Sequence, residues 1–186
     1  MSSILDLPNF KKRTHLVTVE EYHKMGELGY LPKRTELIEG VILHKMPKSP
    51  RHATLVLLLS QILTQRLPEN YHVRTEQPIT LAQSEPEPDL AIVRGQIREY
   101  SQNHPVLAEL VIEVSFSTLA EDREMANIYA EAKIPEYWIF NLNTNTVEAY
   151  LHPLGGRYSE MKTYQKEDTI SPFNFPHTKI DLTEIF

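Results

Sequence analysis

The chain has 186 residues, a formal net charge of −6 at pH 7 and no cysteine. That length fits one domain with a sizeable core, and without cysteine there is neither a disulfide framework nor thiolate chemistry. The negative charge argues against a protein that coats nucleic acid by bulk electrostatics, yet it leaves room for an enzyme with acidic metal ligands and a confined basic track.

Neither a membrane span nor a secretory signal is expected. Every apolar run is shorter than the roughly 18 residues that cross a bilayer. Near the N-terminus the basic cluster follows a short apolar piece, which is the reverse of the order in a secretory signal. We therefore expect a cytoplasmic protein with no membrane partner.

The first half of the chain predicts two helices and a hairpin. Thr18 and Glu21 fit a capping box, which predicts a short helix from 19 to about 28. Residues 35–45, TELIEGVILHK, have the pattern of a hairpin. Apolar residues at helical spacing predict a longer helix from 52 to about 67.

The second half is richer in strands. Strands are predicted over 71–76, 79–82, 89–93, 109–116, 137–141, 146–151 and 157–164, and a second long helix over 121–133. Residues 109–116 form a near-continuous apolar run, typical of a central strand that is covered on both faces. This order predicts an α/β (α+β) fold with a mixed β-sheet flanked by helices.

The domain organisation follows from the same pattern. We expect a single domain over residues 1–186. It would have an N-terminal arm at 1–14, a core from about 18 to 150, and a C-terminal strand extension at 151–186.

Two carboxylates stand inside the apolar strands. Asp89 opens DLAIV, and Glu113 lies within ELVIEVSF. A carboxylate in such a run costs desolvation energy unless it is paired or serves chemistry. If the two strands are neighbours, the pair could hold Mg²⁺, which binds through few protein oxygens and keeps several waters. The alternative is that Asp89 caps a turn and Glu113 pairs with a lysine or arginine.

The motif order resembles a known family. The segments ELIEG, SPRH, PDLAIV, IEVSFST, a helix containing DR, and EYWIF follow one another as in the Uma-two family of bacterial endonucleases. The resemblance covers residues from about 18 to 150 and implies a restriction-endonuclease-like fold with a PD-(D/E)XK site. It implies that Asp89, Glu113 and the carbonyl of Val114 bind Mg²⁺ or Mn²⁺. It also implies that the substrate is a nucleic acid, and DNA is the one we expect.

The chain departs from this family at the lysine of the motif. Ser115 stands at its usual position, and the family's alternative place on the following helix falls on Met125 or Ala126. Arg123 and Lys133 are the candidates to replace it. Arginine could stabilise charge but not readily act as a general base, and Lys133 lies about 10 Å along the helix from Ala126.

Further site residues are expected around this pair. Glu36 matches a family glutamate and could be an additional acid, or a glutamate on an edge strand that faces water. Lys48, Arg51 and His52 form a basic loop that enters a helix, which suits phosphate binding. The alternative for these three is a solvated loop whose histidine caps or packs.

Three functions therefore stay open. The first is a magnesium-dependent endonuclease that acts on DNA, a possible homodimer. The second is a nuclease-derived module that binds nucleic acid or a protein without cleavage, since the lysine is missing. The third is a metal-dependent hydrolase of small phosphoesters.

Overall fold

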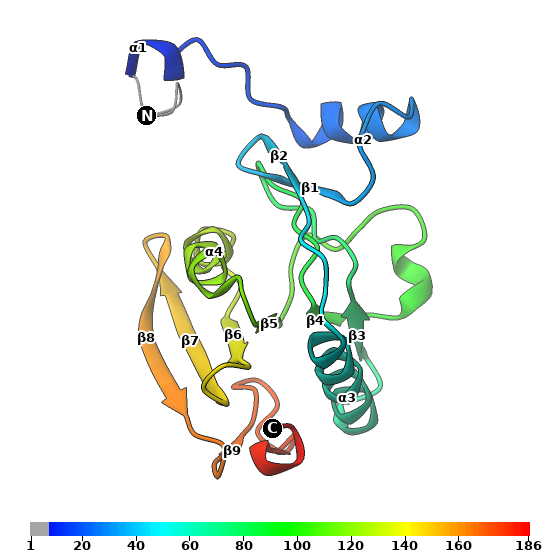
Figure 1. Cartoon of the computed structure of the whole chain (residues 1–186). Coiled ribbons are helices and arrows are strands. Elements are labelled where there is room, and N and C mark those ends of the chain that lie inside the picture. Colours follow the sequence, from blue (N-terminus) through cyan, green and yellow to red (C-terminus); the bar gives the residue numbers. More distant parts are fainter. Residues whose placement is uncertain (1–7) are drawn as a thin grey trace. The chain divides into compact units, whose positions relative to one another are not determined.

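The computed structural model describes residues 8–186 and divides the chain into two compact units (Figure 1). The described part of unit 1 comprises residues 8–45 and 82–86, and unit 2 comprises residues 46–81 and 87–186. Of the predicted arm at 1–14, residues 1–7 lie outside the described residues, while α1 (Pro8–Lys11) forms one short helical turn.

Unit 1 contains the predicted short helix and hairpin. Helix α2 (Val19–Glu27) begins with the expected capping box, in which Thr18 and Glu21 exchange hydrogen bonds. Strands β1 (Thr35–Ile38) and β2 (Val41–His44) pair antiparallel around a tight turn. Both predictions for this part of the chain are confirmed.

Unit 2 is built on a six-stranded mixed sheet with the order β3-β4-β5-β6-β7-β8. Its strands are β3 (Tyr71–Thr75), β4 (Leu90–Arg94), β5 (Leu110–Ser115), β6 (Glu136–Asn141), β7 (Thr146–Leu154) and β8 (Arg157–Tyr164). Strands β5 and β6 are parallel, and the other neighbouring pairs are antiparallel. The parallel pair needs a crossover, which α4 (Leu119–Glu131) supplies.

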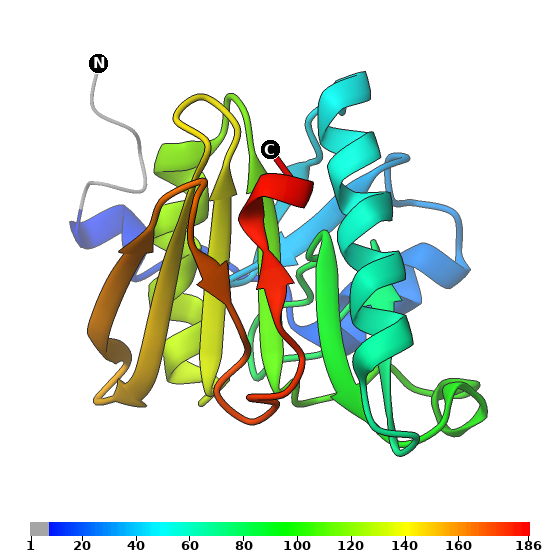
Figure 2. The ribbon, with the colours of Figure 1, turned by 90° about the horizontal axis from the view of Figure 1, so that it is seen from below.

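The two long helices pack on opposite faces of this sheet (Figure 2). Helix α3 (Pro50–Arg66) shares one core cluster with the C-terminal segment, and α4 lies over the other face. Burial on both faces explains why β5 and β6 read as apolar runs without alternation. The predicted mixed sheet between helices is therefore confirmed.

The strand predicted at 79–82 is wrong. Ile79 and Leu81 are buried, but residues 79–82 form no strand, and the Thr80 N–H donates to the Pro105 carbonyl, which lies in a loop. Its apolar residues serve the core cluster beneath α4. The sequence pattern reflected burial in this extended segment and not a sheet ladder.

Short elements complete unit 2. They are η2 (Ile97–Tyr100), β9 (Thr169–Ile170), β10 (Ile180–Asp181) and η3 (Leu182–Glu184). The buried Glu136 side chain accepts hydrogen bonds from Trp138 Nε1 and from the Phe173 backbone, each at 2.7 Å, and so ties the C-terminal segment to β6. Within residues 8–186, no helix has the length and apolar character to cross a membrane.

Candidate metal centre

The strand register brings three carboxylates into one row. Thr75 pairs with Leu90 between β3 and β4, and Leu90 pairs with Ile112 between β4 and β5. Continued by one residue, this register places Asp89 between Glu76 and Glu113. Backbone contacts agree, because the Glu76 N–H donates to the Asp89 carbonyl at 3.1 Å and the Asp89 N–H donates to Glu113 Oε2 at 3.1 Å.

Asp89 is the centre of the row, and its side chain accepts from three protein donors. Lys48 Nζ lies 2.8 Å from Oδ1, His52 Nε2 lies 2.8 Å from Oδ2, and the Val114 N–H also donates to Oδ2 at 2.8 Å. Asp89 is only 6% exposed. Burial alone would raise the pKa of this carboxyl, but the hydrogen bond from His52 and the charge of Lys48 outweigh it and hold the pKa below its usual value.

The start of α3 positions two of these donors. Ser49 caps the helix by accepting from the His52 N–H at 3.2 Å, and Pro50 fills the first turn, where a missing N–H costs nothing. The cap places His52 one turn into the helix. Because its Nε2 faces a carboxylate, Nε2 carries the hydrogen, and the buried Nδ1 has no hydrogen-bond partner within the described residues.

Glu113 is held from the side of α4. The Tyr129 hydroxyl donates to Glu113 Oε1 at 3.2 Å, while Oε2 accepts from the Asp89 N–H. The Val114 N–H points at Asp89, and in a strand the carbonyl of a residue faces the same side as its N–H. Asp89, Glu113 and the Val114 carbonyl are therefore close to one another.

Asp122 adds a further carboxyl from the first turn of α4. Burial raises its pKa to about 6, opposed by the hydrogen bond that it accepts from Thr118 Oγ1, while the charge of Asp89 contributes to the rise. The influence of Asp89 indicates that Asp122 belongs to the same electrostatic environment. The sequence alone assigned no role to Asp122, because its proximity to Asp89 depends on the crossover from β5 to β6.

The other predicted site residues lie in different surroundings. Arg123 forms a bidentate ion pair with Glu148 on β7, through contacts to both carboxylate oxygens. Lys133 is exposed beyond the end of α4, in a left-handed conformation with φ of 60°. Arg51 is exposed and donates to Asn145 Oδ1 at 2.8 Å. Glu36 lies on β1 of unit 1, opposite Leu43.

Glu76 is a site residue that sequence reasoning missed. Its Oε1 lies 2.7 Å from Lys48 Nζ, so the ammonium bridges Glu76 and Asp89. Glu76 follows a strand without any motif of its own, and only the pairing of β3 with β4 shows that it stands beside Asp89. Glu76 could have been identified only if the register between β3 and β4 had been known.

The donor set suits a hard divalent cation. Asp89 and Glu113 offer carboxylate oxygens, and the Val114 carbonyl faces them, which matches the oxygen ligands that Mg²⁺ and Mn²⁺ take up together with water. Within the described part of the chain no cluster of three or more histidine, aspartate or glutamate side chains is arranged around a common ion position. A cation bound by the two carboxylates and the Val114 carbonyl would complete its coordination with water, which is common for Mg²⁺.

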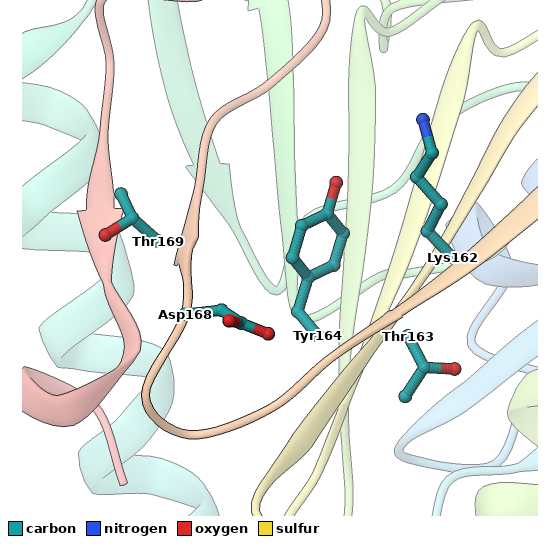
Figure 3. A pocket seen from close by; sticks show the side chains of 5 residues that line it. All are labelled: Lys162, Thr163, Tyr164, Asp168 and Thr169. Atoms are coloured by element: carbon teal, nitrogen blue, oxygen red, sulfur yellow. The ribbon is translucent and has the colours of Figure 1, made fainter.

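A separate pocket lies at the other end of the sheet. It has a volume of about 360 Å³ and is lined by Lys162, Thr163, Tyr164, Asp168 and Thr169 (Figure 3). Asp168 is engaged in the local turn through the Gln165 N–H, and Lys162 pairs with Glu160 at 2.8 Å. Because β6 and β7 separate β8 from β5, this pocket is distinct from the carboxylate row.

Comparisons with known proteins bear on the family and the fold of the chain. A family model, Uma2, described as "Putative restriction endonuclease", matches residues 19–183. Among solved structures, the chain is similar to one described as a "putative nuclease belonging to DUF820 from Anabaena variabilis ATCC 29413". The TM-score is 0.76 at 15% identity, over 91% of this chain and 97% of that chain, which supports a shared fold. No curated protein matches the chain.

Proposed function

This chain belongs to the Uma2 family, described as "Putative restriction endonuclease", and from that premise we propose that it is an endonuclease that cleaves DNA with a divalent metal ion. The observation that carries the proposal is the pairing of Asp89 with Glu113 on neighbouring strands, joined by the hydrogen bond from the Asp89 N–H to Glu113 Oε2. Asp89 is buried and Glu113 is partly buried, and carboxylates on adjacent strands offer the oxygen ligands that a divalent cation takes up. The same two residues match the PD-(D/E)XK motif.

The protein's own groups would prepare the site for Mg²⁺ or Mn²⁺. Asp89, Glu113 and the Val114 carbonyl would hold the ion, which when bound polarises the phosphoryl group and lowers the pKa of water. His52 and the Val114 N–H fix the orientation of the Asp89 carboxylate, and Tyr129 fixes that of Glu113. These partners hold the orientation of the two carboxylates that would bind the ion.

The start of α3 suits the phosphate backbone of DNA. The exposed Arg51 guanidinium stands on the first turn of this 17-residue helix, one residue before His52. A helix N-terminus with a basic side chain attracts phosphate through the helix dipole and direct hydrogen bonds. DNA would then approach Asp89 from the side of α3. The expected homodimer stays a prediction.

Nicking of supercoiled plasmid tests the proposal. We expect activity with Mg²⁺ or Mn²⁺, abolished by a chelator, and reduced at least about 100-fold in Asp89→Asn and in Glu113→Gln, since each removes a negative charge from the ion's ligands. Glu160→Gln is the control, because it removes an equally charged side chain on β8 that is partly exposed. Equal residual nicking in all three variants would rule out a role for the carboxylate pair.

A second candidate function is nucleic-acid binding without cleavage. It is favoured by Ser115, a fully buried serine where the motif has lysine. Fluorescence anisotropy with labelled DNA in Ca²⁺ distinguishes the two functions. If the wild-type protein binds DNA tightly but does not nick it, the result favours nucleic-acid binding without cleavage. Turnover of a small phosphodiester without DNA binding would instead favour a hydrolase of small substrates.

A further inference from the structure

Lys48 places an ammonium group inside the carboxylate row. Its Nζ lies 2.7 Å from Glu76 Oε1 and 2.8 Å from Asp89 Oδ1, and its side chain is 22% exposed. The lysine comes from the segment before α3, far from both Ser115 and the Met125–Ala126 position in the sequence. The strand register sets Glu76 beside Asp89. The ammonium lies between these two carboxylates.

We propose that Lys48 is the lysine of this active site, replacing the one that the motif lacks on β5 and α4. The inference rests on the proposed endonuclease function, and it assigns to Lys48 an electrostatic role. Its ammonium neutralises Asp89 while no metal is bound, and it faces the phosphate of the substrate during cleavage. This is a different role from that of a surface lysine that only adds affinity for the DNA backbone.

Arg123 and Lys133, which the sequence offered as replacements for the motif lysine, are placed less well for this role. Both guanidinium nitrogens of Arg123 that face β7 are engaged by Glu148. Lys133 lies 11 positions beyond Asp122, which corresponds to about 16 Å along a helix. Of these three cationic residues, Lys48 is the one in contact with Asp89.

Within residues 8–186, the Lys48 ammonium has two carboxylate partners, which leaves one of its N–H donors for a ligand. A lysine has three N–H donors, and Glu76 and Asp89 take two of them. The third donor can therefore reach a phosphate oxygen while the two ion pairs persist. The partial exposure of the side chain keeps this approach open, whereas a fully buried ammonium could not meet DNA.

The same geometry couples Lys48 to metal binding. Asp89 Oδ1 accepts from the ammonium, so a divalent ion on Asp89 has a positive charge as its neighbour. Two like charges about 4 Å apart repel each other appreciably at a partly buried site. Removal of the Lys48 charge should therefore strengthen metal binding, even though it weakens catalysis.

The test compares Lys48→Met and Lys48→Arg with Lys162→Met in the full chain. Lys162 is a matched control, since it forms a 2.8 Å ion pair with Glu160 on β8, away from the carboxylate row. Mn²⁺ binding is measured by electron paramagnetic resonance, DNA affinity by anisotropy in Ca²⁺, and cleavage in single turnovers. Circular dichroism confirms folding, and Lys48→Arg keeps the charge if Lys48→Met is unstable.

We expect Lys48→Met to bind Mn²⁺ at least about threefold more tightly than the wild type. Its single-turnover rate should fall about 100-fold or more, with DNA affinity changed less than about threefold. Lys48→Arg should keep part of the rate and bind Mn²⁺ like the wild type, and Lys162→Met should match the wild type in every measurement.

Other results separate the inference from the proposed function. If the wild type cleaves nothing but Lys48→Met still binds Mn²⁺ more tightly, the endonuclease proposal fails and Lys48 stands as the cation of the site. Unchanged or weaker Mn²⁺ binding in Lys48→Met overturns the inference, as does cleavage within threefold of the wild type. A loss confined to DNA affinity also overturns it, because it would make Lys48 a backbone contact only.

Discussion

Asp122 holds a carboxyl group where ionisation is unfavourable. Its pKa is raised to about 6 by burial, so the native protein binds a proton there more tightly than the unfolded chain, in which the carboxyl keeps its ordinary pKa of 3.8. The group's contribution to stability is thus fully present below about pH 4. It is lost as the pH rises through about 6.

Asp122→Asn should therefore stabilise the metal-free protein at neutral pH. The gain at pH 7 relative to pH 4 is expected to be on the order of 1–2 kcal/mol, reduced from the full effect of the pKa shift by the partial exposure of the side chain. Urea unfolding at both pH values, with a chelator present, measures it. Glu124→Gln, exposed on the same helix, controls for the loss of one negative charge. A gain that is equal at pH 4 and pH 7 would contradict the assignment.

At the scale of the element, the turn between β1 and β2 depends on Gly40. The residue has φ of +78°, and an added Cβ would lie 2.6 Å from Leu16 Cβ and 3.2 Å from the Val17 carbonyl oxygen. The chain approaches so closely because the Val17 N–H donates to the Gly40 carbonyl at 2.9 Å. A side chain at this position would both strain the backbone and push these two segments apart.

Gly40→Ala is expected to destabilise unit 1 by about 2–3 kcal/mol, more than the roughly 1 kcal/mol cost of a left-handed alanine. Gly29→Ala is the control that measures the cost of the left-handed conformation without a clash. Gly29 has φ of +72°, and no atom lies within 4 Å of an added Cβ. Chemical unfolding followed by circular dichroism compares the two variants. Equal losses would show that the conformation alone, and not the contact with Leu16, makes glycine necessary.

The sequence predicted the elements better than the contacts between them. Periodicity was sufficient for α3, α4 and the buried strands, because each of these elements places a continuous apolar face or run against the core. It failed at 79–82, where buried residues belong to an extended segment without a ladder. The sequence also suggested that Asp89 and Glu113 lie close together, because Asp89 stands at the start of one apolar strand and Glu113 lies within another.

The position of Lys48 beside Asp89 could not be read from the sequence. It depends on three long-range facts, namely the β3–β4 register, the β4–β5 register and the cap that begins α3. Local patterns carry no information on such pairings. The same limit explains why neither Glu76 nor Asp122 was predicted from the sequence.

At the scale of the whole molecule, a net charge of −6 opposes the approach of DNA, so binding should depend on a few well-placed cations. Arg51 is the candidate on the exposed start of α3, where Asn145 Oδ1 orients its guanidinium. Each phosphate that a cation neutralises contributes about 0.9 to the slope of log affinity against log salt for double-stranded DNA. Arg51→Ala should therefore lower that slope by about 0.9 and weaken binding equally for all sequences.

Anisotropy titrations from about 50 to 200 mM salt measure this slope, a range over which phosphate contacts dominate the salt dependence. Arg157→Ala is the matched control, because Arg157 is an exposed arginine on β8, separated from β5 by two strands. It removes the same charge from the whole molecule, so it should lower affinity only slightly and leave the slope unchanged. If both variants shift the slope equally, DNA responds to the net charge of the protein, and the start of α3 is not its binding track.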